Sequence, residues 1–175
     1  MRRVVLIAAA VALLDQLTKY LVAGFIDGQG VVPVIPGFFN LVNWSNTGAA
    51  WGMFQNYNLV LAVVSVLTVL ALYFFRDSLQ YRRAGSGIAL GLITGGIVGN
   101  FVDRARLGHV VDFLDFYTNA EPVAAWLQRT IGSSHWPAFN VADSAICVGV
   151  TLYILVSWRA GAGEESAEVP KCPSA

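Results

Sequence analysis

Two carboxylates in apolar surroundings are the residues of this chain best suited to chemistry. Asp112 stands inside the stretch VVDFL, and Asp143 follows Asn140 by three residues at the start of an apolar run. Two carboxyl groups that share one site cannot both ionise cheaply, so one keeps a proton while the other accepts a proton from water. Asp143 alone would be interpreted as an acid that stabilises a helix N-terminus, but the presence of Asp112 favours acid-base catalysis.

A second group of polar residues interrupts the first apolar run of the chain. Asp15, Thr18 and Lys19 are spaced by three and four residues, which places them on one face of a helix. Ionisable groups inside a membrane segment are costly and therefore indicate function. The alternative is an ion pair between Asp15 and Lys19 that only supports the helix, because one turn separates the two charges.

The stretch GNFVDR brings Asn100, Asp103 and Arg104 within about one helical turn. These residues are either part of a polar site or an ordinary helix end whose arginine reaches the lipid headgroups. We expect Asp103 to serve the helix end together with Arg104. Asp115, which follows in DFLDFY, is interpreted as a solvated loop acid.

Composition identifies the chain as a membrane protein. Of its 175 residues, 56% are hydrophobic and 13% are charged, and the mean hydropathy is +0.60. This composition is more apolar than that of an ordinary soluble domain. The net charge of zero excludes the basic surface that nucleic acid binding requires. Apolar runs near the length that crosses a bilayer predict four spans, at about 4–23, 59–75, 86–104 and 139–158.

The positions of the basic residues predict the orientation of these spans. Cytoplasmic loops hold the excess of Lys and Arg, so we expect both termini in the cytoplasm and two long outer loops. The first outer loop, with VVPVIPGFFNLVNW, predicts short strands at the membrane surface, and AEPVAAWLQRTIG in the second predicts a short interfacial helix. Residues 1–160 would form a single domain, followed by a disordered cytoplasmic tail at 161–175. The basic residues that support this orientation are Arg2, Arg3, Arg76, Arg82, Arg83 and Arg159.

Five motifs together resemble the lipoprotein signal peptidases, also called signal peptidase II. They cover all four predicted spans in the order of that family. The motifs are DQLTK at 15–19, NTGAAWG at 46–52, GNFVDR at 99–104, VVDF at 110–113 and FNVAD at 139–143.

The resemblance implies an aspartic endopeptidase of the bacterial inner membrane with its active site on the periplasmic side. Such an enzyme removes the signal peptide from diacylglyceryl-modified prolipoproteins, on the N-terminal side of the lipid-modified cysteine. It implies no metal or other cofactor and inhibition by globomycin. We further expect contact with membrane phospholipid, whose phosphate Arg104 could meet, and a monomer, because four helices can surround one site. The implied fold is mainly α, with four transmembrane helices, a small extracytoplasmic β-cradle and a short periplasmic helix.

The same resemblance assigns roles to individual residues of this chain. Asp112 and Asp143 would be the catalytic dyad, and Asp15 and Lys19 a structural pair on the first helix. Two features depart from the family: the outer segment 114–136 is longer than expected, and Trp51 stands where Phe is common. The residues that would line the active site are Asn46, Gly48, Asn100, Arg104 and Asn140.

Three alternatives compete with the aspartic dyad. A serine peptidase through Ser45 or Ser144 lacks a positioned base nearby, and a proton relay would need polar residues through the inner half of the spans as well. The relay would use Asp15, Lys19, Asp112 and Asp143. A metallopeptidase would use His109, Asp112, Asp115 and His135, although no HExxH motif occurs.

Overall fold

Helices make up most of the protein. The computed structural model describes residues 1–28, 30–48 and 53–167, with side chains up to residue 160. Within these ranges, three helices are long and apolar enough to cross a membrane by length and composition. They are α1 (Arg2–Phe25), α3 (Ala84–Leu107) and α5 (Val141–Ala167), and the shorter apolar helix α2 (Asn58–Phe74) has 17 residues.

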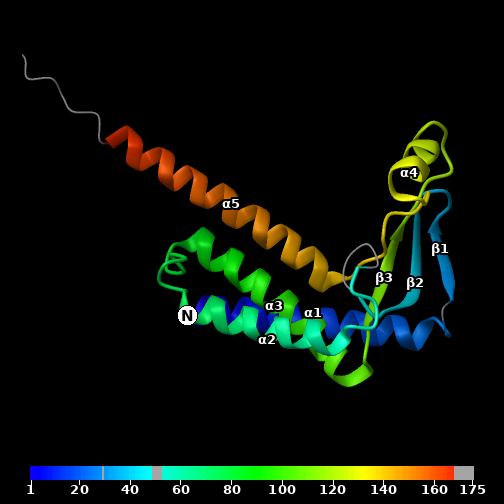
Figure 1. Ribbon diagram of the computed structural model, residues 1–175, viewed down its shortest axis with the longest axis horizontal. Helices are drawn as coiled ribbons and strands as arrows, with labels where there is room; N and C mark the ends of the chain where they lie inside the picture. Colours follow the sequence, from blue (N-terminus) through cyan, green and yellow to red (C-terminus); the bar gives the residue numbers. More distant parts are fainter. Residues whose placement is uncertain (29, 49–52, 168–175) are drawn as a thin grey trace, which may run out of the picture.

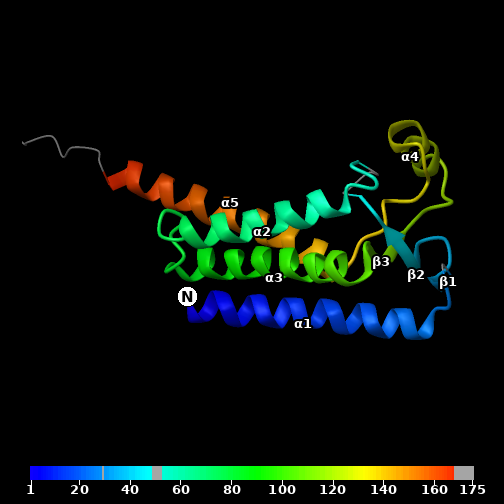
Figure 2. The same ribbon diagram turned by 60° about the horizontal axis from the view of Figure 1, so that its bottom comes forward.

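Helix α3 is the centre of the bundle. Figure 2 shows it between α1 and α2, and α5 packs against it as well. Small residues on α3 allow this close packing. A Cβ atom on Gly99 would lie 2.6 Å from Oδ2 of Asp15, so only glycine lets the two backbones bring this carboxylate against α3.

A three-stranded antiparallel sheet stands at the end of the bundle remote from the N-terminus (Figure 1). The strands β1 (Val31–Ile35), β2 (Phe39–Asn46) and β3 (Val110–Phe116) lie in that order, and Trp44 of β2 is directly opposite Asp112 of β3. The chain before α5 runs along the free edge of β3, where Phe139 pairs with Leu114. The sheet therefore connects directly to the first turn of α5.

Most of the predicted elements are present in the structure, which adds one strand and has a longer last helix. All four predicted spans are helices, and the expected strands and the short helix, α4 (Val123–Ile131), are present. Strand β3 was not predicted from the residues themselves. Helix α5 continues through residues 161–167, which composition assigned to a disordered tail. The rest of that tail, 168–175, lies outside the described residues, as does Trp51.

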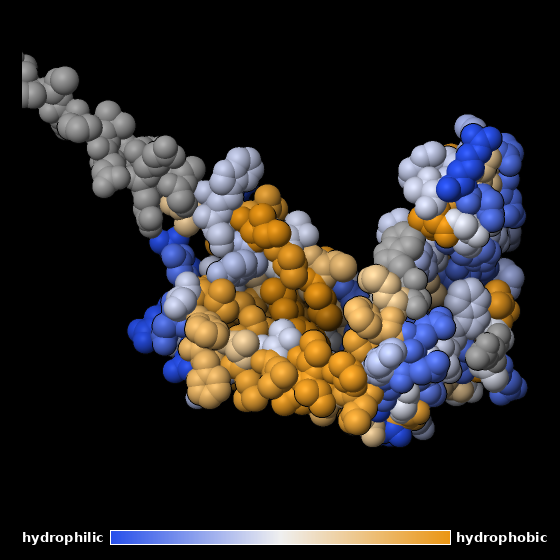
Figure 3. Space-filling model, in the orientation of Figure 1, coloured by the Kyte–Doolittle hydropathy of each residue, from blue (hydrophilic) through white to orange (hydrophobic). Residues whose placement is uncertain are grey.

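The outer surface of the helices is apolar, as a bilayer requires. Figure 3 shows hydrophobic side chains gathered over the helices and hydrophilic ones over the sheet and α4. Leu59 and Trp158 are 76% and 73% exposed, which would be unusual for large apolar side chains facing water. By contrast, Asp15 and Lys19 of α1 are buried inside the bundle.

Candidate active site

Asp112 projects from the middle of β3 and is almost completely buried. Its two carboxylate oxygens accept hydrogen bonds from amides of different elements. Asn46 donates from Nδ2 to Oδ2 at 2.9 Å, and Asn140 donates from Nδ2 to Oδ1 at 2.7 Å. Helix α3 ends at Leu107, so a strand and not a membrane-spanning helix carries this residue.

Asp143 lies in the first turn of α5, where the helix dipole favours a negative charge. Nδ2 of Asn100 donates to its Oδ1 at 2.8 Å, and the backbone N–H of Asn140 donates to its Oδ2 at 3.2 Å. In return, Oδ1 of Asn140 accepts the backbone N–H of Asp143 at 3.0 Å. This reciprocal arrangement fixes the carboxylate at the start of the helix.

The environment of Asp112 makes its ionisation costly. Burial raises the pKa of Asp112 to about 7, and the nearby charge of Asp143 also raises it, whereas hydrogen bonds from Asn46 and Asn140 and the charge of Lys19 lower it. The carboxyl group therefore changes charge near neutral pH. A pair of acids in which one keeps a proton near pH 7 has the properties needed for acid-base chemistry.

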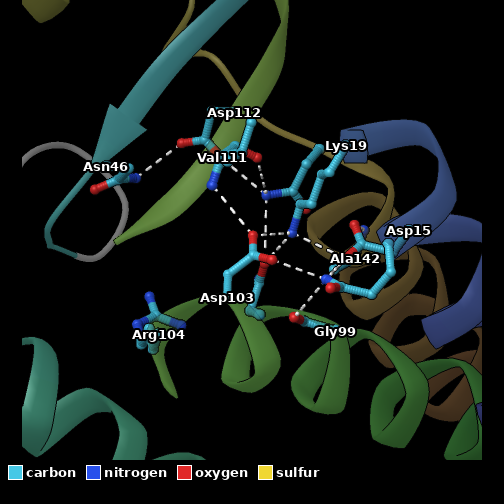
Figure 4. Close-up of polar contacts among 12 residues, drawn as sticks. Asp15, Lys19, Asn46, Gly99, Asp103, Arg104, Val111, Asp112 and Ala142 are labelled. Carbon is cyan, nitrogen blue, oxygen red and sulfur yellow. Dashed lines mark hydrogen bonds and ion pairs between the residues drawn. The ribbon is translucent and has the colours of Figure 1, made fainter. Parts of the chain in front are cut away.

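Lys19 is the centre of a buried ion cluster that lies close to Asp112 (Figure 4). Nζ of Lys19 lies 2.8 Å from Oδ2 of Asp15 and 2.8 Å from Oδ2 of Asp103. It also donates to Oδ1 of Asn100 at 3.1 Å. Because Asn100 binds Asp143, the cluster connects the predicted structural pair of α1 to one of the two acids.

Asp15 and Asp103 connect this cluster to the elements that carry the acids. Oδ1 of Asp15 accepts the backbone N–H of Ala142 in the first turn of α5 at 2.9 Å. Oδ2 of Asp103 accepts the backbone N–H of Val111, next to Asp112, at 3.1 Å. The expectation that Asp103 serves the helix end with Arg104 was therefore wrong, because Asp103 pairs with Lys19 and orients β3.

Sequence reasoning missed Gln16 as a member of the cluster. Its Nε2 donates to Oδ1 of Asp103 at 2.8 Å and to the carbonyl oxygen of Gly99 at 3.2 Å. A signal was available, because Gln16 is a polar residue in an apolar run and precedes Lys19 by three residues, which places both on one helix face.

Arg104 reaches the acids indirectly, through the first outer loop. Its Nη2 donates to the carbonyl oxygen of Gly48 at 3.1 Å, and the N–H of Gly48 donates to Oδ1 of Asn46 at 2.9 Å. Asn46 in turn binds Asp112. Arg104 thus points toward the loop, not toward lipid headgroups. A Cβ atom on Gly48 would lie 2.5 Å from the carbonyl oxygen of Met53, so this turn requires glycine.

Both acids open onto one cavity of about 1000 Å³ between the sheet, α5 and the segment after α4. Figure 3 shows the surface deeply hollowed between α5 and the part of the molecule that carries α4. The walls are mainly apolar, as in most ligand sites. Besides Asp112 and Asp143, the cavity wall includes Trp44, Asn46, Ile131, Ser133, Trp136, Phe139, Ser144 and Cys147.

Asp115 is a fully buried residue, so its interpretation as a solvated loop acid was wrong. It is 0% exposed and accepts hydrogen bonds at 2.8 Å from Nδ2 of Asn40 and from Nδ1 of His135. His135 and Asp115, two of the four metal ligands in the metallopeptidase alternative, therefore bind each other. No group of three or more His, Cys, Asp and Glu that could hold a metal ion occurs in the part of the chain that the structure describes.

The serine and relay alternatives find no support in the geometry. Oγ of Ser144 donates to the carbonyl oxygen of Asn140 at 2.9 Å, so no described base activates it. Of the four relay residues, Asp15 and Lys19 pair with each other, whereas Asp112 and Asp143 lie on β3 and in the first turn of α5, next to the sheet. Fold and site together define a membrane-embedded peptidase of the aspartic class.

Comparisons with known proteins identify the family. The family model for Signal peptidase (SPase) II matches residues 7–159. The chain is 43% identical over 166 residues to the lipoprotein signal peptidase of Syntrophotalea carbinolica, covering 91% of this chain and 93% of that protein. It is 44% identical over 168 residues to that of Nitratidesulfovibrio vulgaris, covering 90% of each.

A solved structure shares the fold as well. The structure described as "Bacterial membrane enzyme structure by the in meso method at 2.3 A resolution" superimposes with a TM-score of 0.77 at 28% identity, covering 99% of this chain and 96% of that one. The chain belongs to the signal peptidase II family. It is thus a multi-pass membrane protein and an aspartic peptidase that removes signal peptides from prolipoproteins.

Proposed function

We propose that Asp112 and Asp143 are the catalytic dyad of this peptidase. The observation that supports the proposal best is their shared environment: two buried carboxylates from different elements are joined through Asn140 and border the same cavity. Asn46, Gly48, Asn100, Arg104 and Asn140 position the dyad and the substrate. Asp15 and Lys19 are structural supports.

In the proposed mechanism the two acids have different starting roles. Asp112 holds the shared proton, and Asp143, stabilised as a carboxylate by Asn100 and the start of α5, takes a proton from the attacking water. Asp112 then protonates the carbonyl oxygen of the scissile peptide bond. In the second step Asp143 returns its proton to the leaving amine, while Asp112 takes a proton from a hydroxyl group of the tetrahedral intermediate. The C–N bond breaks, a carboxylic acid and a free amine form, and the pair is again singly protonated, with the proton on Asp112.

The shape of the cavity favours one direction for the substrate. Its wall continues from Ser144 and Cys147 on α5, which spans the membrane, to Ile131 at the end of α4 and Ser133 just after it. The signal peptide lies along α5, and the mature part of the prolipoprotein leaves past α4. The bond on the N-terminal side of the lipid-modified cysteine then meets the dyad while the diacylglyceryl chains stay in the bilayer.

The orientation of the bundle follows the distribution of basic residues. Arg2, Arg3, Arg76 and Arg82 belong to the end remote from the sheet, which favours a cytoplasmic location for that end and for both termini. The dyad then lies at the periplasmic face of the inner membrane. We propose that α2 completes a four-helix transmembrane bundle, that the enzyme works as a monomer, and that globomycin blocks the cavity.

Cleavage of a purified diacylglyceryl-modified prolipoprotein in detergent, with EDTA present, tests the dyad. Wild type should cleave, whereas Asp112→Asn and Asp143→Asn should lose activity by at least about 10³-fold. Asp77→Asn is the matched control, because Asp77 is 67% exposed in the α2–α3 connection, and it should retain full activity. Activity in either dyad variant, or loss of wild-type cleavage in EDTA that zinc restores, would refute the proposal.

The same assay tests the substrate and the inhibitor. A prolipoprotein without the diacylglyceryl group should be cleaved poorly, and globomycin should inhibit cleavage of the modified form. Equal turnover of both forms would show that the lipid is not recognised. Full activity at saturating globomycin would show that the inhibitor does not bind this cavity.

A further inference from the structure

A second cavity lies in the opposite half of the helix bundle, remote from the sheet. It measures about 310 Å³ and lies between α1, α2 and α3. The α1 residues that border it recur every three or four positions from Met1 to Ala12, so one helix face forms the wall. Small side chains on that face create the hollow. The apolar wall includes Ala8, Ala9, Ala12, Leu72, Leu90 and Val98.

The length of this cavity suits an acyl chain. The wall residues at the N-terminal end of the chain extend over positions 1 to 12, which correspond to roughly 18 Å along the helix axis. The cavity ends at Ala12, one turn before Asp15, so it does not reach the buried ion cluster or the dyad. Because α1 and α3 are long enough to cross the membrane, the occupant of a cavity between them must be apolar.

One charged side chain, Arg76, borders the cavity at its end near the N-terminus. The guanidinium lies 4.6 Å from the ring centroid of Tyr73, and Nη1 donates to the carbonyl oxygen of Tyr73 at 2.8 Å. These contacts hold the cation in place while its side chain remains 30% exposed. Asp77, 4.0 Å away, is 67% exposed, so it neutralises the charge only weakly.

The N-terminus adds positive charge to the same end. Met1 borders the cavity and is followed by Arg2 and Arg3. Figures 1 and 2 both place the N-terminus beside the α2–α3 connection, which carries Arg82. An apolar cavity with a cationic mouth is complementary to a molecule with an acyl chain and a negatively charged headgroup. Guanidinium groups bind phosphate oxygens with two hydrogen bonds, and the positive charges at this end favour a headgroup of net negative charge over a zwitterionic headgroup, which carries a cation of its own.

We propose that this cavity is a binding site for one anionic phospholipid. One acyl chain fills the space between Ala9 of α1 and Leu72 of α2, and the headgroup phosphate binds Arg76. The lipid fills the space between α1 and α2, both of which rest on α3. Its ligand is a resident membrane lipid and not the substrate. Because the two cavities share no wall residue, lipid binding can be measured separately from catalysis by the dyad.

Native mass spectrometry of the purified, delipidated protein tests this site. The protein is mixed with equal amounts of phosphatidylglycerol and phosphatidylcholine of identical acyl chains. Wild type should retain one phosphatidylglycerol with a preference of about fivefold or more over phosphatidylcholine. Arg76→Gln should lose this preference. Arg159→Gln is the matched control, because Arg159 lies on α5 outside the cavity wall, and it should behave like wild type.

A second variant tests the acyl-chain part of the site. Ala9 is exposed on α1, so Ala9→Phe should fold normally while its ring fills the cavity and prevents retention of either lipid. Equal retention of both lipids by wild type, unchanged binding by Arg76→Gln or Ala9→Phe, or equal loss in Arg159→Gln would each overturn the proposal. Binding is measured without substrate, so none of these results bears on the dyad.

Discussion

Nδ2 of Asn140 lies 2.7 Å from Oδ1 of Asp112, and this one amide sets the geometry of the site. Its Oδ1 accepts the backbone N–H of Asp143, while the side chain is 0% exposed. A single planar group therefore holds an acid on a strand and an acid on a helix in fixed relation. Two carboxylates that share a proton require such a fixed arrangement.

Replacement of Asn140 by Ala should reduce kcat/KM by about 10²-fold, because small misplacements of reacting groups cost that much. The measurement is cleavage of a diacylglyceryl-modified prolipoprotein under single-turnover conditions. Asp27→Ala, at an exposed position between α1 and β1, is the control and should be neutral. Wild-type rates for Asn140→Ala would show that the dyad does not need this amide.

The pH dependence of cleavage should reflect the pKa of Asp112. In the proposed mechanism its protonated form donates to the carbonyl oxygen, so kcat/KM should fall as pH rises through about 7. The hydrogen bond from Asn46 stabilises the ionised form and lowers the pKa. Asn46→Ala should therefore raise the pKa and move the alkaline limb to higher pH.

The pH profile of kcat/KM for wild type and Asn46→Ala, measured from pH 5 to 9, checks this expectation. If Asp112 acts as the base instead, its pKa sets the acidic limb, and Asn46→Ala will move that limb to higher pH while the alkaline limb stays in place. The apparent value belongs to the coupled pair, so the decisive observation is which limb moves.

Lys19 neutralises two buried carboxylates, and its removal should destabilise the bundle. Lys19→Met leaves Asp15 and Asp103 as uncompensated buried charges, which costs about 3–5 kcal/mol. The midpoint of thermal unfolding in detergent should fall accordingly. Adding Asp103→Asn to Lys19→Met should recover part of the loss, because one unpaired charge disappears.

Arg106→Met is the control for Lys19→Met, since Arg106 is exposed near the end of α3. It should leave the midpoint of thermal unfolding unchanged. An equal decrease in both variants would show that general charge loss, and not the buried cluster, determines stability. No change in Lys19→Met would show that the ion cluster contributes nothing to folding.

The helices could be predicted from the sequence because a bilayer requires long apolar runs, which local composition reveals. Strand β3 could not be predicted in this way. Its residues VVDFLDF are mostly buried on both faces, so the alternation that marks a half-exposed strand is missing. The position of Asp112 on a strand therefore became visible only in the structure.

The motifs predicted which residues belong to the site. They could not predict the hydrogen-bond and ionic partners of these residues, because the partners lie in distant parts of the chain. Asp103 was assigned to its neighbour Arg104, but its ionic partner Lys19 precedes it by more than 80 residues. Asp115 looked like a loop acid because nothing nearby in sequence buries it. His135 and Asn40 cover it from other parts of the chain, and sequence spacing carries no information about such contacts.

The outer segment 119–133 should control which substrates the cavity accepts more than whether the protein folds. Its ends are already joined, because the N–H of Thr118 donates to the carbonyl oxygen of Ser134 at 3.2 Å, so a short glycine turn can replace it. The replacement removes α4 and the wall residues Ile131 and Ser133. Relative kcat/KM values across prolipoproteins that differ after the modified cysteine should change by at least about tenfold. A flexible linker of the original length is the control, and it should behave like the short turn if α4 itself makes the contacts. Unchanged kinetics on every substrate, with normal membrane insertion, would show that the segment has no part in recognition.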